Sequence, residues 1–270
     1  MKKLISGLRD FKANYFSTHL QLFEQLAHGQ KPRFLFITCS DSRIDPNLIT
    51  QTEVGELFVI RNAGNIIPPF GAANGGEGAA VEYAVHALGI EQIVVCGHSH
   101  CGAMKGLLQL NKLQEDMPLV YDWLKHAEAT RRLVKENYGN YTGEELLEVT
   151  VAENVLTQID NLKTYPVIHS KLYQEKLKIY GWVYHLETGE VLAYDPVSHA
   201  YVAPQSQLLD DESDNELIPG HFASTNAPLI ACERPHHQKG GNGAQQDSSS
   251  ISWLPPEQAE RIYRGSVERR

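Results

Sequence analysis

Three short runs of mostly apolar residues constrain the fold of this 270-residue chain more than any other feature. They are RFLFIT (33–38), GELFVIRN (55–62) and QIVVCG (92–97). Apolar side chains that do not alternate with polar ones indicate strands buried on both faces, which is typical of a parallel sheet. We therefore predict an α/β fold with a mainly parallel central sheet flanked by helices.

The segments around these strands have helical patterns. Leucines and aromatic residues at near-helical spacing predict one or two amphipathic helices over residues 3–28, an N-terminal helical arm that ends near Gly29. Residues 178–195 are predicted to form a hairpin with Thr188 and Gly189 at or near its turn. The other predicted helices lie at 75–90, 119–137, 143–163 and 165–177.

The composition of the chain changes after Pro204. Residues 208–216 carry five acidic side chains, and residues 235–250 are polar and rich in glycine and serine. Such segments bury too little apolar area to fold alone, which predicts a disordered tether, and a short helix could start near Pro256. We therefore divide the chain into a main domain with the helical arm, 1–203, and a partly disordered C-terminal tail, 204–270.

Charge and composition exclude several classes of protein. A net charge of −9 argues against a nucleic-acid binder, which would show a basic face. No apolar run approaches the roughly 18 residues that span a bilayer, and the N-terminal lysines are not followed by the apolar region of a signal peptide. Four cysteines are too few for a disulfide framework, so we expect a reducing, cytoplasmic location.

Ligand-type side chains follow two of the predicted strands. Cys39 comes directly after the first run, His98 comes directly after the third, and Cys101 follows His98 three residues later. Because the carboxyl ends of parallel strands meet at one edge of a sheet, the three side chains can converge. Two thiolates and an imidazole suit zinc, and three protein ligands leave the fourth position open, as in catalytic zinc sites.

An acid and a base lie beside the first of these ligands. Asp41 and Arg43 follow Cys39 at spacings of two and four residues. Asp41 would lie close enough to accept a hydrogen bond from the water that the metal acidifies, and Arg43 can hold Asp41 through a two-pronged pair. Without that restraint, Asp41 could bind the metal itself and fill the open position.

Each of these residues also has an ordinary explanation when it is taken alone. Cys39 would be an inert core thiol, and Asp41 and Arg43 a capping and ion pair at a turn. His98-x-x-Cys101 alone is a weak zinc signal. Three ligand-type residues at one sheet edge, beside an acid–base pair, are harder to explain by packing, so we favour the metal site.

Three motifs follow one another along the chain: Cys39-x-Asp41-x-Arg43, GELFVIRNAGN (55–65) and GHSHCGA (97–103). In this order they resemble the motifs of the β-class carbonic anhydrases. The resemblance covers about residues 1–200 and implies that the main domain is a catalytic domain. It implies one Zn²⁺ per chain on Cys39, His98 and Cys101, with Asp41 and Arg43 as the catalytic dyad.

The resemblance also implies a substrate pocket of the plant type. The pattern of that pocket matches here at Gln30, Phe58, Tyr83 and Gly102. In that family the Gln, Phe and Tyr come from the partner subunit, so the resemblance implies that a homodimer, or a higher even oligomer, is the active unit. One pocket position that is often valine is Ala63 here.

The activity implied by the resemblance is the reversible hydration of CO2 to bicarbonate and a proton. The tail resembles that of cyanobacterial carboxysomal members, which implies a short segment that binds a carboxysome scaffold protein. The enzyme would then lie in the carboxysome lumen and supply CO2 to Rubisco as part of a carbon dioxide concentrating mechanism. Two alternatives remain: a hydrolase of another small cumulated molecule, such as carbon disulfide, and a non-catalytic zinc scaffold protein.

Overall fold

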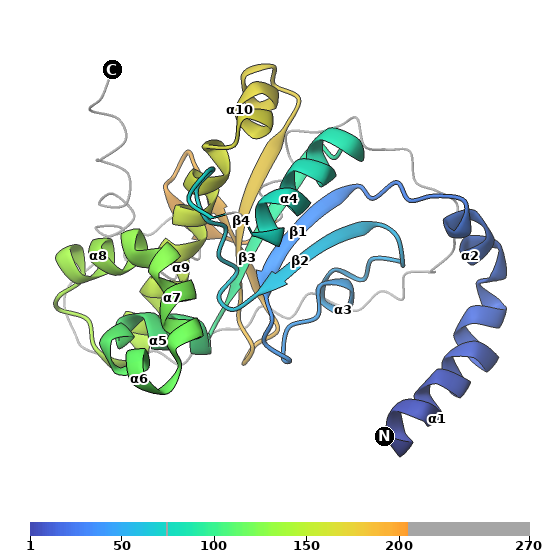
Figure 1. Ribbon diagram of the computed structural model, residues 1–270, viewed down its shortest axis with the longest axis horizontal. Helices are drawn as coiled ribbons and strands as arrows, with labels where there is room; N and C mark the ends of the chain where they lie inside the picture. The colour runs from blue at the N-terminus through green and yellow to red at the C-terminus, as the bar shows by residue number, and fades with distance from the viewer. Residues whose placement is uncertain (74, 205–270) are drawn as a thin grey trace, which may run out of the picture. The chain divides into compact units, whose positions relative to one another are not determined.

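The computed structural model describes residues 1–73 and 75–204 (Figure 1). The chain divides into two units, Met1–Tyr194 and Asp195–Arg270. The predicted tether and the predicted helix near Pro256 lie outside the described residues. The domain boundary at 203/204 stays a prediction. Among the described residues, no helix is both long enough and apolar enough to cross a membrane.

The sheet of the first unit is mainly parallel, as the apolar runs predict. β1 runs parallel to β2 and to β3, and β4 runs parallel to β3. β5 runs antiparallel to β4 as the second arm of the predicted hairpin. Gly189 lies in the turn of that hairpin with φ +73°. β6 (Ala200–Val202) follows β5 in the chain. The spatial order is β2 (Leu57–Asn62), β1 (Phe34–Cys39), β3 (Gln92–His98), β4 (Lys178–Tyr184) and β5 (Val191–Asp195).

The predicted helices are present, with one correction. The segment 119–137 is not a single helix: α7 and α8 are separated by a 3-10 turn, because Ala127 (φ −102°, ψ 17°) leaves the helical region. Helices were not predicted at α3 (Pro46–Thr50), α5 (Gly102–Leu108) and α6 (Leu113–Asp116). The predicted helices are α4 (Gly76–Glu82, continued by the π-helical Tyr83–Ala87), α7 (Pro118–Leu124), α8 (Glu128–Asn137), α9 (Gly143–Lys163) and α10 (Pro166–Tyr173).

Helix α9 is the principal support of the sheet near the candidate site. It packs against β3 and β4, and α8 packs on it (Figure 1). Glycines in the two strands allow this close approach. A Cβ at Gly97 would lie 2.9 Å from a methyl group of Val155, and a Cβ at Gly181 would lie 3.0 Å from the same side chain. Larger residues at either position would push the helix away from the sheet.

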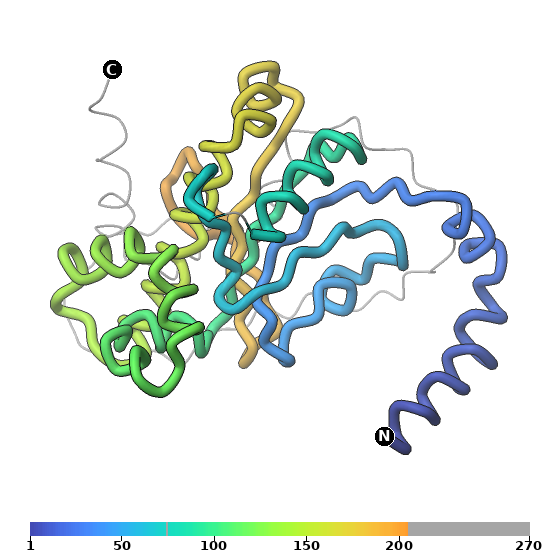
Figure 2. The backbone as a smooth tube through the Cα atoms, viewed as in Figure 1, coloured from blue at the N-terminus to red at the C-terminus, as the bar shows by residue number. Residues whose placement is uncertain are grey.

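The predicted N-terminal arm is present as two helices that lead away from the sheet (Figures 1 and 2). They are α1 (Lys2–Asp10) and α2 (Leu20–Ala27), joined by a π-helical segment, Phe11–Phe16. No residue of these three segments is buried within the chain. On the apolar face that the sequence pattern predicts, Leu4, Leu8 and Phe11 are exposed, and the remaining members are partly exposed.

Candidate metal centre

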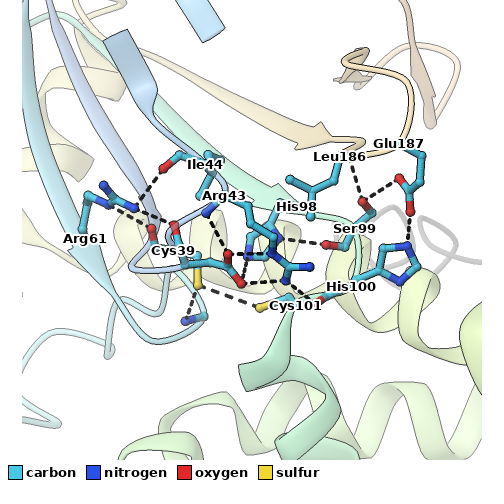
Figure 3. Close-up of polar contacts among 12 residues, drawn as sticks. Cys39, Arg43, Ile44, Arg61, His98, Ser99, His100, Cys101, Leu186 and Glu187 are labelled. Atoms are coloured by element: carbon cyan, nitrogen blue, oxygen red, sulfur yellow. Dashed lines mark hydrogen bonds and ion pairs between the residues drawn. The ribbon is translucent and has the colours of Figure 1, made fainter. Parts of the chain in front are cut away.

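The structure brings Cys39, His98 and Cys101 together at one edge of the sheet (Figure 3). Cys39 is the last residue of β1, and His98 is the last residue of the parallel neighbour β3. Cys101 lies just before the first residue of α5. The two sulfur atoms are 4.0 Å apart, and the three ligand atoms lie within 4.8 Å of one another. Parallel pairing of β1 and β3 therefore places the three side chains at one point.

The imidazole of His98 is oriented as a metal ligand. Its Nδ1 lies 2.8 Å from the carbonyl oxygen of Ser99, and a carbonyl can only accept, so Nδ1 carries the proton. The opposite atom, Nε2, therefore presents a lone pair. His98 is 0% exposed, and Nε2 has no hydrogen-bond partner among the described residues. A buried lone pair without a partner is rare in proteins, and a cation held at this point would supply the partner.

The two cysteines complete a donor set that fits zinc. Tetrahedral zinc with sulfur at about 2.3 Å separates two thiolates by about 3.8 Å, close to the observed spacing. The pKa of Cys39 is lowered to about 4, chiefly by its contact with the Cys101 thiol. Burial acts in the opposite direction, while His98 and backbone amides add to the lowering. The same contact and burial raise the pKa of Cys101. The pair thus gives up one proton readily, and a metal ion would replace the second.

Asp41 and Arg43 form the two-pronged pair beside these ligands. Arg43 Nε donates to Asp41 Oδ1 at 2.9 Å and Nη2 donates to Oδ2 at 2.8 Å, and Nη2 also donates to the His100 carbonyl oxygen at 3.2 Å. The Arg43 guanidinium holds the pKa of Asp41 well below its usual range, against the opposing effect of burial. Asp41 Oδ2 lies 3.9 Å from His98 Nε2 and is not among the converging ligand atoms.

The four pocket residues lie in two different places. Gly102 begins α5 directly after Cys101, at the metal edge. Phe58 and Tyr83 contact each other, with ring centroids 6.1 Å apart, but Phe58 pairs with Leu35 in the sheet. Leu35 is four residues before Cys39, which is about 13 Å along a strand.

Gln30 lies farther still from the metal edge, because it precedes the first residue of β1. Within one chain, the structure therefore does not bring Gln30, Phe58 or Tyr83 to the metal centre.

Arg61 is a site residue that sequence reasoning missed. It donates to the carbonyl oxygens of Cys39 at 3.0 Å, Asp41 at 2.8 Å and Ile44 at 2.9 Å (Figure 3). These carbonyls belong to the turn that carries the first ligand and the dyad, so one guanidinium fixes its shape. The motif GELFVIRNAGN contains this arginine, but the residue types around it do not indicate which groups the arginine binds.

A second group of polar side chains supports the turn between β3 and α5. Ser99 Oγ donates to Glu187 Oε2 at 2.9 Å and accepts from the Leu186 amide at 2.9 Å. His100 contacts Glu144 through Nδ1 at 2.9 Å and Glu187 through Nε2. Burial of the imidazole acts to lower the pKa of His100, but the two carboxylates outweigh this effect and raise that pKa. The hairpin and the start of α9 are thereby tied to the residues between the two ligands.

Known proteins are similar to this chain in sequence and in fold. The family model described as carbonic anhydrase matches residues 34–191. The chain belongs to the carbonic anhydrase family. A carbonic anhydrase from Synechocystis is 61% identical over 98% of this chain and 100% of its own length. The predicted enzyme class is therefore confirmed.

Solved structures place this carbonic anhydrase in the β class. The structure of the β-carbonic anhydrase CcaA is 70% identical, covers 76% of this chain and 99% of its own, and superposes with a TM-score of 0.75. A structure described as one of two tetrameric β-carbonic anhydrases from Sordaria macrospora is 28% identical, covers 71% of this chain and 95% of its own, and has a TM-score of 0.65. The predicted β-class fold is thus confirmed.

Proposed function

We propose that the chain catalyses the reversible hydration of CO2 to bicarbonate and a proton, with one Zn²⁺ held by Cys39, His98 and Cys101. The observation that supports this most is the buried Nε2 of His98, which has no hydrogen-bond partner among the described residues and lies beside two sulfurs at zinc spacing. When bound, zinc would lower the pKa of a water molecule enough to make a nucleophile available near neutral pH.

The chain's own residues would hold this centre open for the reaction. Arg43 occupies both oxygens of Asp41, so the carboxylate is kept from becoming a fourth ligand. With its pKa well below its usual range, Asp41 is an acceptor only. It would therefore orient the attacking O–H group by accepting its hydrogen bond, while Arg61 and the His100 carbonyl keep the dyad in place.

The substrate pocket would be completed by a second copy of the chain. Gln30, Phe58 and Tyr83 lie toward the far end of β1 and β2 from the ligands of their own chain. A pocket built from all three and Gly102 therefore needs a partner subunit that brings its own copies to the metal edge. The description of the Sordaria relative as tetrameric supports an even oligomer.

Zinc content together with the rate of CO2 hydration tests this proposal. We expect one zinc per chain and rapid hydration in a stopped-flow assay with a pH indicator. Zinc bound without CO2 hydration would favour a scaffold protein, and hydrolysis of carbon disulfide in place of CO2 hydration would favour the other small-molecule hydrolase. A protein that purifies without zinc and cannot be loaded with it would contradict the proposed centre.

We further propose that the tail, 204–270, places the enzyme in the carboxysome lumen of the cytoplasm by binding a scaffold protein there. The match to the Synechocystis relative extends over 98% of this chain, so it includes most of the tail. Every proposed ligand and pocket residue lies before Pro204. A chain ending at residue 203 should therefore keep CO2 hydration and lose scaffold binding in a pull-down. Equal scaffold binding by the truncated chain would contradict this role.

A further inference from the structure

The loop that follows β2, residues 63–70, is held by buried polar side chains of α9. Asn154 Nδ2 donates to the Gly64 carbonyl oxygen at 2.9 Å, and Gln158 Oε1 accepts from the Ile67 amide at 2.9 Å. Asn154 is 1% exposed and Gln158 is fully buried. A buried amide side chain destabilises a fold unless its polar atoms are hydrogen-bonded. Two such side chains that both bond to one loop therefore indicate that the helix holds this loop in place.

Two further side chains extend the pattern. Asn161 Nδ2 donates to the Ile67 carbonyl oxygen at 2.9 Å, and the Tyr165 hydroxyl donates to the Pro68 carbonyl oxygen at 2.9 Å. Spacings of four and three residues place Asn154, Gln158 and Asn161 along one face of α9, and Tyr165 follows that helix as the residue before α10. We call these four residues the polar ladder.

Gly64 is the point where the ladder reaches the metal centre. Its N–H donates to Cys39 Sγ at 3.4 Å, while its carbonyl oxygen accepts from Asn154. Its φ of +86° favours glycine, and a Cβ there would lie 2.8 Å from Met104 Cε. Gly64 therefore links α9 to a ligand sulfur through its backbone alone.

We infer that Asn154 is a positioning residue of the metal centre: by holding the Gly64 carbonyl, it keeps the Gly64 N–H on the Cys39 thiolate. The inference rests on the metal centre proposed above. A hydrogen bond to a ligand sulfur withdraws electron density from it and so tunes the metal–sulfur bond. Two thiolates formally neutralise one dication, and the Gly64 N–H offsets part of the negative charge that stays on the Cys39 sulfur.

A purely structural role for Asn154 predicts something different. If the ladder only fastened the loop, removing any rung would lower thermal stability and leave the sulfur unchanged. Tyr165→Phe provides this control, because it deletes one buried hydrogen bond from the ladder to the loop without touching Gly64. Asn154→Leu keeps the approximate shape of the side chain and has no group that can donate to the Gly64 carbonyl.

The test uses full-length protein in which cobalt(II) replaces zinc, since thiolate-to-cobalt charge-transfer bands report electron density on the sulfur. We expect the band of Asn154→Leu to shift to longer wavelength. The band of Tyr165→Phe should match wild type, even where this variant also unfolds at a lower temperature. Asn154→Ser, which is too short to reach Gly64, is measured beside Asn154→Leu and should show the same shift.

The outcomes separate this inference from the proposed function. An unshifted band in both Asn154 variants, failure of both to fold, or an equal shift in Tyr165→Phe would overturn the positioning role while leaving the metal centre intact. A wild-type protein that takes up cobalt without a charge-transfer band would overturn thiolate ligation, and this inference with it.

Discussion

The two ends of strands β1 and β2 differ in how completely one chain builds them. At the carboxyl end, Cys39 is buried, its carbonyl is held by Arg61 and its sulfur by Gly64. At the amino end, Gln30 and Tyr83 are exposed, and the arm beyond them buries no residue within the chain. At one end of these strands the side chains are therefore buried and fixed by contacts within the chain. At the other end they are exposed and have room for contacts with another chain.

This difference indicates which parts of the proposed site need a partner. Metal ligands must be held within narrow geometric limits, so each is fixed by contacts inside one chain. The pocket residues need only meet a small substrate, and another copy of the chain can supply them. We therefore expect variants at the carboxyl end to act through metal and dyad, and variants at the amino end to act through association.

Loss of a ligand should have the largest effect. Cys101→Ala removes an anionic ligand from a three-ligand site, so we expect loss of zinc and of measurable CO2 hydration. Metal analysis and stopped-flow rates check both. Cys96→Ala is the matched control, since that buried thiol lies outside the converging group and burial raises its pKa to about 12. If Cys96→Ala lost its zinc while Cys101→Ala kept it, the ligand would be Cys96 and not Cys101.

Breaking the dyad should have a smaller but still large effect. In Arg43→Ala, zinc should be retained, while the unrestrained Asp41 carboxylate moves toward the metal and the rate falls by about 100-fold or more. Arg33→Ala, which removes an arginine that is ion-paired with Glu56 outside the dyad, serves as the control. Hydration at the wild-type rate in Arg43→Ala would show that Arg43 does not restrain Asp41.

The smallest effect concerns the stability of the helix behind the metal centre. Burial raises the pKa of Glu153 in α9 to about 7, although the Tyr138 hydroxyl donates to it at 2.5 Å. Between about pH 4.5 and pH 7 the folded state therefore binds more protons than the unfolded state, and stability falls as the pH rises. Glu153→Gln should remove a loss of about 3 kcal/mol over this range.

Chemical denaturation at pH 4.5 and pH 8 measures this dependence. Glu145→Gln, at an exposed acid of the same helix, should keep the wild-type pH dependence. An identical pH dependence in Glu153→Gln and wild type would show that the Glu153 carboxyl ionises as freely in the fold as in the unfolded chain.

The sequence predicts the parts of this molecule that depend on local spacing. Cys39, Asp41 and Arg43 lie within five residues of one another, and the apolar runs identify the parallel strands that bring His98 beside them. The contacts by which Arg61 and Asn154 support the site could not be recognised in this way, because they go to backbone carbonyls 17 to 90 residues away. A contact between a side chain and a distant backbone carbonyl leaves no pair of residue types to find in the sequence.

The spacing of polar residues on α9 does indicate a buried polar face. Asn154, Gln158 and Asn161 recur at helical spacing within a helix that also buries leucines and valines. A helix buried against a sheet has no solvent for such side chains, so their spacing indicates a buried polar face. What they bind still depends on where the loop after β2 passes, which only the fold decides.

Mixed oligomers test most directly the claim that one chain supplies the metal and dyad and another supplies the pocket. Gln30→Ala should lose about 100-fold in rate with its zinc intact, and Cys101→Ala should lose its zinc. Co-expressed with two different tags, the pair forms dimers in which the metal of one chain meets Gln30 of the other. We predict that the mixture regains about a quarter of the wild-type rate. Mixed oligomers that co-purify through both tags and yet stay as slow as the single variants would contradict the account.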